Sequence, residues 1–277
     1  MSNKIQLGIM QGRLLPKYKG RFQAHPVSYW SEEFPLAQER NLDLIEFILD
    51  FNDFRLNPLL SSNGLIEIKE ATNKTGVKVK TICADYFMIK TFHKNSQSEI
   101  NESINVLNTL IRNSKEIGVE QIIIPCVDSS SLKKQDFNLF ITNIKDCLVN
   151  AEKQNISICL ETDLNPEEFS HLLSLLPYES VKVNYDIGNS ASLGYDIEEE
   201  FYAYGDKVIN IHIKDRLLNG GSVELGSGDV DFDQVLNMLK NIKYEEVMIM
   251  QSYRDDIGVE IFDKQLKFIK DKFFEIL

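Results

Sequence analysis

Eight short apolar segments recur along the chain, and each is followed by a segment with helical spacing. The apolar segments are rich in Val, Ile and Leu, as strands buried in a parallel sheet are. They cover residues 5–10, 42–49, 77–84, 121–127, 156–161, 181–186, 208–214 and 246–251. The helical segments cover residues 27–40, 65–75, 100–117, 137–154, 166–176, 197–204, 232–242 and 259–277.

This eightfold alternation predicts an all-parallel sheet, because parallel strands are joined by helical crossovers. For residues 1–277 the simplest arrangement is an α/β fold with one domain, a closed (β/α)8 TIM barrel. A doubly wound open sheet is the alternative, but Gly12 does not belong to a GxGxxG turn and no Walker A pattern occurs. Gly76 and Gly118 are expected to end helices, and Asn165 before Pro166 to begin one.

Charge and composition restrict the partners. The chain has 42 acidic and 30 basic residues, a formal net charge of −12. This charge repels polyanions, so nucleic acid is not expected to bind, whereas a small anionic substrate could bind to a few local cationic groups. The four cysteines form no CxxC pair, the first residues lack the long apolar core of a signal peptide, and no uncharged run reaches transmembrane length. We therefore expect a reduced, cytoplasmic protein without membrane contact.

One predicted strand, VINIHIKD at residues 208–215, contains a histidine among isoleucines. Side chains alternate along a strand, so one face would be apolar and the other polar. The apolar face would hold Ile209, Ile211 and Ile213, and the polar face Asn210, His212 and Lys214. Taken alone, such a histidine is most simply a hydrogen-bonded interior residue.

Three further strands end in a polar side chain. The active site of a TIM barrel lies at the carboxyl ends of its strands. The last four strands would each deliver one potential ligand there, namely Glu161, Asp186, His212 and Gln251. One by one these are ordinary helix caps, turn formers or solvated groups, but a bound divalent cation explains all four together. The mostly oxygen donor set favours Mn²⁺ or Mg²⁺, with Co²⁺ and Zn²⁺ as alternatives.

These motifs resemble those of the xylose isomerase-like TIM barrel superfamily. Within it, the chain is most similar to the sugar and sugar-phosphate isomerases and epimerases, including L-ribulose-5-phosphate 3-epimerases and ketose 3-epimerases. The matching pieces span the chain: GIMQGRL, IEF, ET, YDIGN, HIKD and GSGDVDF. In that family a Glu, an Asp, a His and a second Glu bind the metal, and the first three match Glu161, Asp186 and His212. The resemblance also implies a carbohydrate substrate and a homodimer or larger homo-oligomer.

The chain departs from the family at the fourth ligand, which is Gln251 instead of glutamate. The family moves a proton on the carbon next to a sugar carbonyl through a metal-stabilised enediolate, and epimerisation uses two glutamates. An amide cannot carry a proton at neutral pH, which leaves Glu161 as the base. Three hypotheses follow: an isomerase using Glu161 alone, an epimerase whose second acid/base is Glu46 or Asp85, and a protein that binds a sugar or sugar phosphate without turnover.

Several other side chains are candidates for substrate contacts. Lys214 shares a face with His212 and could polarise a substrate oxygen. The glycine-rich loop could present backbone N–H groups to a phosphate. The expected substrate-binding residues are Gln11, Arg13, Glu46, Tyr86, Gly226, Ser227, Gly228 and Arg254. The DNA repair endonucleases of the same superfamily are a poor match, because the chain has only four histidines and is strongly acidic.

Overall fold

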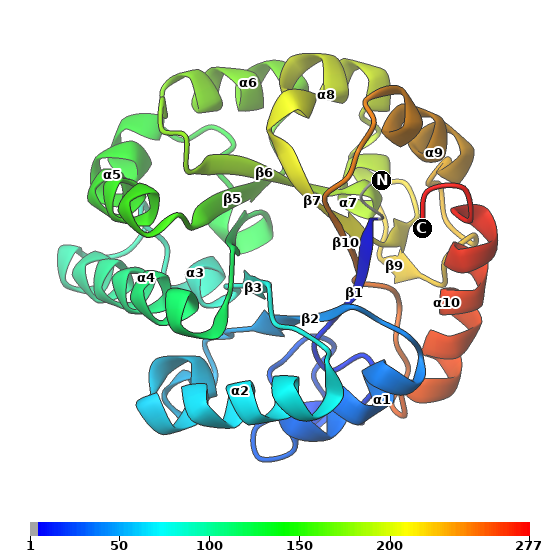
Figure 1. The fold of residues 1–277 in the computed structure, drawn as a ribbon. Helices are drawn as coiled ribbons and strands as arrows, with labels where there is room; N and C mark the ends of the chain where they lie inside the picture. Colours follow the sequence, from blue (N-terminus) through cyan, green and yellow to red (C-terminus); the bar gives the residue numbers. More distant parts are fainter. Residues whose placement is uncertain (1–4) are drawn as a thin grey trace.

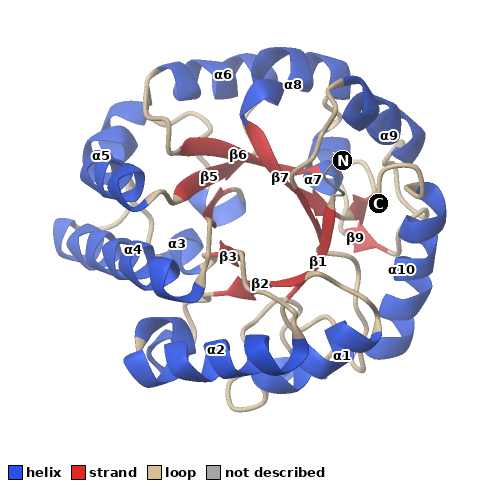
Figure 2. Ribbon diagram, in the orientation of Figure 1, coloured by secondary structure: helices blue, strands red, loops and turns tan. Residues whose placement is uncertain are grey.

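The computed structural model describes residues 5–277 and shows the expected barrel. Eight parallel strands close in the order β1-β10-β7-β6-β5-β4-β3-β2. They are β1 (Gln6–Met10), β2 (Leu44–Ile48), β3 (Thr81–Cys83), β4 (Gln121–Cys126), β5 (Ser157–Thr162), β6 (Val181–Asp186), β7 (Val208–Ile213) and β10 (Val247–Met250). In a view along the barrel axis, helices surround the ring of strands (Figures 1 and 2). The closed (β/α)8 prediction is confirmed, and the open sheet is wrong.

The outer ring contains the helices that the sequence predicts, with small changes in their bounds. They are α1 (Glu33–Glu39), α2 (Ser62–Thr75), α4 (Gln97–Ile117), α5 (Phe137–Gln154), α6 (Pro166–Ser174), α8 (Ile197–Tyr204), α9 (Phe232–Asn241) and α10 (Val259–Lys272). Helix α1 is shorter than predicted. It begins at Glu33, which places Pro35 in the first turn, where a missing N–H breaks no helical hydrogen bond.

The predicted helix ends are also confirmed. Gly76 and Gly118 adopt left-handed φ values of 80° and 79° directly after α2 and α4. Asn165 caps α6 through its side chain, and Glu168 bonds back to complete a capping box.

Some short elements at the carboxyl ends of the strands were not predicted. They are α3 (Tyr86–Ile89), α7 (Ile187–Leu193) and the antiparallel pair β8 (Asp215–Arg216) and β9 (Ser222–Val223). Each is too short to show a periodic pattern. Helix α7 follows β6 directly, and Asp186 is its N-cap, with a side chain that accepts a hydrogen bond from Asn189 N at 2.8 Å.

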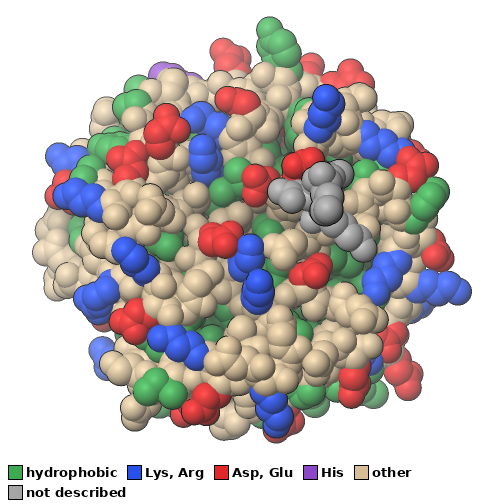
Figure 3. Space-filling view, in the orientation of Figure 1, with side chains coloured by type: hydrophobic (Ala, Val, Ile, Leu, Met, Phe, Trp, Pro, Cys, Tyr) green, Lys and Arg blue, Asp and Glu red, His purple; other side chains and the backbone are tan. Residues whose placement is uncertain are grey.

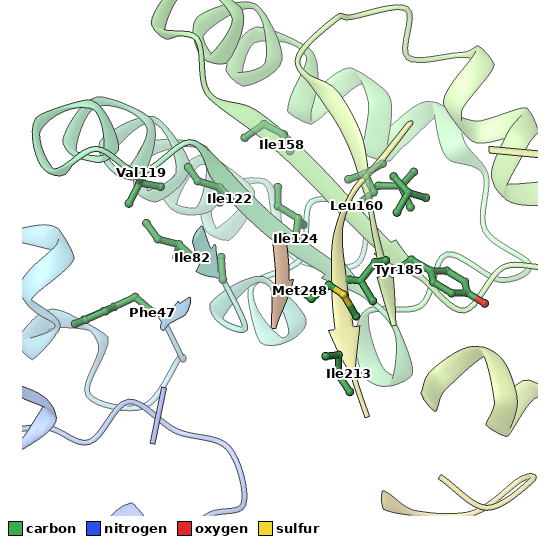
Figure 4. Close-up of a cluster of buried hydrophobic side chains, with 14 of the residues drawn as sticks. Phe47, Ile82, Val119, Ile122, Ile124, Ile158, Leu160, Tyr185, Ile213 and Met248 are labelled. Atoms are coloured by element: carbon green, nitrogen blue, oxygen red, sulfur yellow. The ribbon is translucent and has the colours of Figure 1, made fainter. Parts of the chain in front are cut away.

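Two apolar layers follow from the alternation of side chains along the strands. The outer faces pack against the helices, as Ile82, Ile122, Ile124, Ile158 and Leu160 do in Figure 4. The inner faces form a second, smaller cluster inside the barrel, which includes Ile123, Cys159 and Ile249. Above this interior cluster, the same inner faces turn polar toward the carboxyl ends of the strands.

Strand β7 departs from simple alternation at one position. Ile211 and Ile213 pack outward as predicted, but Ile209 packs with the interior cluster. The pairing with β6 shifts register here, from Val183 opposite Val208 to Asn184 opposite Asn210. One extra residue in β7 therefore reverses the direction of Ile209, as a bulge does.

The molecular surface shown in Figure 3 carries acidic and basic side chains interspersed with one another, without a continuous basic patch on the coloured part of that face. All four cysteines are buried free thiols. Within residues 5–277, every helix is too short or too polar to cross a bilayer.

Candidate metal centre and active-site cavity

Three predicted ligands meet at the carboxyl ends of neighbouring strands. Glu161 ends the inner face of β5, Asp186 ends β6, and His212 lies beside Asp186 in the β6–β7 pairing. One ligand atom from each lies within 4.8 Å of the others, and all three residues are buried. Donors on opposite sides of one ion with bonds of about 2.1 Å would be about 4.2 Å apart, so small shifts suffice to bind it.

The imidazole of His212 is oriented by a carboxylate on its far side. Its Nε2 lies 2.7 Å from Glu46 Oε1, and its Nδ1 faces Glu161 Oε2 at 3.4 Å. Burial opposes charge on this ring, but Glu46 and Glu161 outweigh it and raise the pKa of His212 to about 10. A carboxylate that accepts the outer N–H of a metal-binding histidine is a recurring arrangement, because it directs the other nitrogen at the ion. The donor set fits a divalent cation, which would take the place of the Nδ1 proton when it binds.

Amide side chains fix the carboxylate of Glu161. Asn189 Nδ2 donates to Glu161 Oε1 at 2.8 Å, and Asn184 Nδ2 donates to Oε2 at 2.8 Å. On Asp186, Oδ1 accepts the cap bond from α7 while Oδ2 faces Lys214 Nζ at 3.2 Å. Asp186 is thus a helix cap, as the simplest interpretation had it, and also a member of the ligand cluster.

Gln251 lies next to this cluster, as the strand-eight position predicts. Its Oε1 is 3.3 Å from Lys214 Nζ, and its Nε2 donates to Gln23 Oε1 at 3.1 Å. Gln23 also accepts from Arg13 Nη2 at 3.0 Å and donates to Asp85 Oδ2 at 2.7 Å. Because arginine can only donate and a carboxylate here accepts, these contacts set the orientation of both amides. The carbonyl oxygen of Gln251 faces Lys214.

A cavity of about 420 Å³ opens beside the ligands. Glu161, Lys214 and Gln251 line it, as do residues that the sequence did not single out as pocket residues. These are Phe22, Gln23, Cys83, Met88, Pro125, Val127, Asp128, Asn189, Arg216, Gly221 and Ser222. Asp85, which the sequence named as a candidate acid/base, also lines the cavity. Arg216 could not be found from alternation, because it lies on the short strand β8 after the barrel strand ends. A larger groove of about 580 Å³ lies outside the barrel between α1 and α2.

The other predicted substrate-binding residues lie away from the lining of this cavity in the described part of the chain. Gln11 bonds His25 and Ile48, and Tyr86 packs against Phe54 and Phe87. Contact between these two side chains and a substrate stays a prediction.

The two arginines hold the loop after β1. Arg254 donates to the carbonyl oxygens of Gly12 and Leu15 at 2.7 and 2.6 Å, and Arg13 Nε donates to Ser252 O at 2.9 Å. Their guanidinium groups bond the chain itself, so the structure gives them a structural role, and binding of an anionic group stays a prediction.

The glycine-rich loop differs from the expected phosphate-binding loop. The N–H groups of Gly226 and Gly228 donate to Asp215 Oδ2 at 2.9 and 2.8 Å. A carboxylate of the chain thus occupies the donors that a phosphate would need, and Ser227 lies between them. Binding of a phosphate by Gly226, Ser227 and Gly228 stays a prediction, and it would require the N–H groups of the two glycines to release Asp215.

Comparison with known proteins identifies the family of the chain. Residues 34–272 match the family described as xylose isomerase-like TIM barrel. The chain belongs to this family. Among curated relatives, a putative L-ribulose-5-phosphate 3-epimerase of Haemophilus influenzae is 21% identical over 242 residues, 82% of this chain and 84% of the relative. The inosose isomerase of Bacillus velezensis is 21% identical over 260 residues, 87% of this chain and 89% of the relative.

Solved structures of xylose isomerase-like proteins share the barrel. The IOLI protein "with a binding zinc atom" superposes with a TM-score of 0.76 at 18% identity, over 99% of both chains. The D-psicose 3-epimerase of Clostridium cellulolyticum H10, solved with D-tagatose, gives 0.74 at 14% identity, also over 99% of both chains. The resemblance to L-ribulose-5-phosphate 3-epimerases and ketose 3-epimerases is thus confirmed as a distant homology.

Proposed function

We propose that this xylose isomerase-like chain is a divalent-metal-dependent isomerase or epimerase of a sugar or sugar phosphate. The observation that carries the proposal is the buried cluster of Glu161, Asp186 and His212 beside a cavity that contains acid/base groups. The volume of the cavity, about 420 Å³, is within the range of about 300–1,000 Å³ that small-molecule sites occupy. The distant relatives named as sugar epimerases and inosose isomerase support the same class of substrate.

Glu161, Asp186, His212 and the amide oxygen of Gln251 would hold the cation. When bound, it would act as a Lewis acid toward a substrate carbonyl and a neighbouring hydroxyl, and so make the adjacent C–H group more acidic. Mn²⁺ or Mg²⁺ suits the oxygen-rich donors, and the imidazole also permits Zn²⁺ or Co²⁺.

The side chains of the site have separate roles in this proposal. Glu161 accepts the proton from the carbon next to the carbonyl, and the hydrogen bonds from Asn184 and Asn189 keep its carboxylate facing the cavity. Lys214 and Arg216 line the same cavity and would donate to substrate oxygens. Glu46 orients His212 from below. The cationic groups would also attract a phosphorylated substrate.

Proton exchange and metal binding test this function. The protein with Mn²⁺ in D₂O is expected to introduce deuterium next to the carbonyl of a ketose or its phosphate, as detected by NMR. Glu161→Gln should slow this exchange by roughly 10²–10⁴-fold, as loss of a general base does. Glu179→Gln, an exposed position on the loop before β6, is the matched control and should leave exchange unchanged. Binding of sugars without exchange, by protein that carries metal, would favour the non-catalytic binding protein instead.

A further inference from the structure

Three carboxylates line the cavity, and two of them, Glu161 and Asp85, are shielded from solvent while Asp128 is exposed. Glu161 belongs to the ligand cluster, whereas Asp85 lies outside it, two residues beyond Cys83 on the inner face of β3. Asp85 Oδ2 accepts from Gln23 Nε2 at 2.7 Å, and Oδ1 accepts from the Cys83 thiol at 3.2 Å. Strand β4 separates β3 from β5 in the barrel. The two carboxylates therefore reach the cavity from different parts of its wall.

The network around Gln251 connects the departure from the family pattern to Asp85. The Nε2 of Gln251 donates to Gln23, and Gln23 in turn donates to Asp85. Gln251 is thus an amide at the position where the family is expected to have a glutamate. Asp85, which Gln23 connects to Gln251, brings a carboxylate to the same cavity. The cavity still contains two groups that can exchange a proton, although the strand-eight residue cannot.

The other acidic candidates are placed less suitably. Glu46 is fully buried beneath the cavity, and its two oxygens are bonded to His212 Nε2 and Asn210 Nδ2. Asp128 lines the cavity but is exposed to solvent. Asp85 is half-buried, and the loss of water around its carboxyl raises its pKa to about 6. The hydrogen bonds from Gln23 and Cys83 act in the opposite direction, whereas the charges of Glu161 and Asp50 raise the pKa further. A carboxyl group with such a pKa can both accept and return a proton near neutral pH.

We propose that Asp85 is the second acid/base of the reaction, so that the chain epimerises its substrate. This inference rests on the proposed function. Glu161 takes the proton as the C–H bond breaks, and the electron pair moves through the new C=C bond to the carbonyl oxygen. The pair then returns to the same carbon, which takes a proton from the Asp85 carboxyl on the other side. Glu161 ends protonated and Asp85 ionised, and exchange with solvent restores both.

The experiment uses the Mn²⁺-loaded chain in D₂O with L-ribulose 5-phosphate, D-tagatose and D-allulose as probes. NMR follows deuterium incorporation and the appearance of the epimer. The wild-type protein should give both with at least one probe. Asp85→Asn keeps an oxygen for Gln23, and should retain deuterium incorporation through Glu161 while epimer formation falls by roughly 10²–10⁴-fold. Asp136→Asn, an exposed cap of α5 at which asparagine caps equally well, is the control and should change neither.

Two further measurements separate a catalytic role from a structural one. The proposed step uses the protonated carboxyl of Asp85, so the wild-type rate of epimerisation in that direction should fall as the pH rises through about 6. This pH dependence should be missing in the residual activity of Asp85→Asn. Calorimetry should show the same Mn²⁺ affinity in both proteins, because Asp85 lies outside the ligand cluster.

The possible failures are distinguishable. Epimer formation by Asp85→Asn at the wild-type rate would overturn the role of Asp85. Deuterium incorporation by the wild-type protein without any epimer would also overturn it, but would leave the proposed function standing as an isomerase with one base. Absence of exchange with every probe would overturn the proposed function itself, and the role of Asp85 with it.

Discussion

Replacement of Gln251 by glutamate should destabilise the metal-free protein, although glutamate is the residue expected at this position of the family. The substitution would remove the hydrogen bond from Gln251 Nε2 to Gln23 Oε1, and an oxygen of the new carboxylate would face that carbonyl oxygen instead. Gln23 cannot rotate its amide to compensate, since its oxygen also accepts from Arg13 and its nitrogen donates to Asp85. The substitution therefore places two acceptors against each other in a partly buried network.

The size of the effect follows from these contacts. The lost hydrogen bond is worth about 1 kcal/mol, and a buried acceptor left without a donor costs about 1–3 kcal/mol more. Repulsion from Asp186 and Glu161 acts in the same direction, and Lys214 is already paired with Asp186. The total of about 2–4 kcal/mol corresponds to a fall in Tm of about 4–8 °C for a chain of this size.

Thermal unfolding in EDTA and in Mn²⁺ tests this reasoning. In EDTA, Gln251→Glu should unfold below the wild type. Mn²⁺ should raise its Tm by more than it raises that of the wild type, because the added carboxylate is a charged ligand. Gln97→Glu adds the same charge at an exposed site and should change stability by less than about 0.5 kcal/mol. A Tm in EDTA equal to or above the wild-type value would refute the argument.

Two other predictions concern the loops that carry the site. Glu33 accepts from the N–H groups of Gly12 and Leu14 at 2.6 and 2.9 Å, and burial raises its pKa to about 7. The folded state then holds a proton that the unfolded state releases near pH 4.5, so the free energy of unfolding should fall by up to about 3 kcal/mol as pH rises from about 4.5 to 7. Urea unfolding across this range should show the decrease in the free energy of unfolding with pH, and Glu33→Gln should lack it. The same decrease in the variant would contradict its assignment to Glu33. Gly228→Ala would place a Cβ 2.2 Å from Asp215 Oδ1, so it should break the hydrogen bonds between Asp215 and the loop and lower the free energy of unfolding by about 1–3 kcal/mol. Gly221→Ala meets no atom within 4 Å and should be tolerated. Equal stability of the two variants would contradict the close contact between Gly228 and Asp215.

Local sequence was sufficient for most of the barrel. Strand periodicity fixes which face a side chain occupies, so the inward direction of Glu161, Asp186 and His212 could be predicted without any tertiary contact. The ends of α2, α4 and α6 could be predicted too, because glycine in the left-handed region and an Asn-Pro start act within one helical turn.

The partners of these side chains came only from the tertiary structure. Glu46 and Asp85 were equal candidates in the sequence, because both lie on inner faces. Closure of the barrel brings Glu46 against His212, 166 residues away, and leaves Asp85 at the cavity. Likewise Gln251 donates a hydrogen bond to Gln23, 228 residues away in the sequence, and Asp215 accepts hydrogen bonds from the glycine-rich loop. Periodicity gives the face of a strand but not the height of a residue along the barrel, which the stagger between all eight strands sets when the sheet closes.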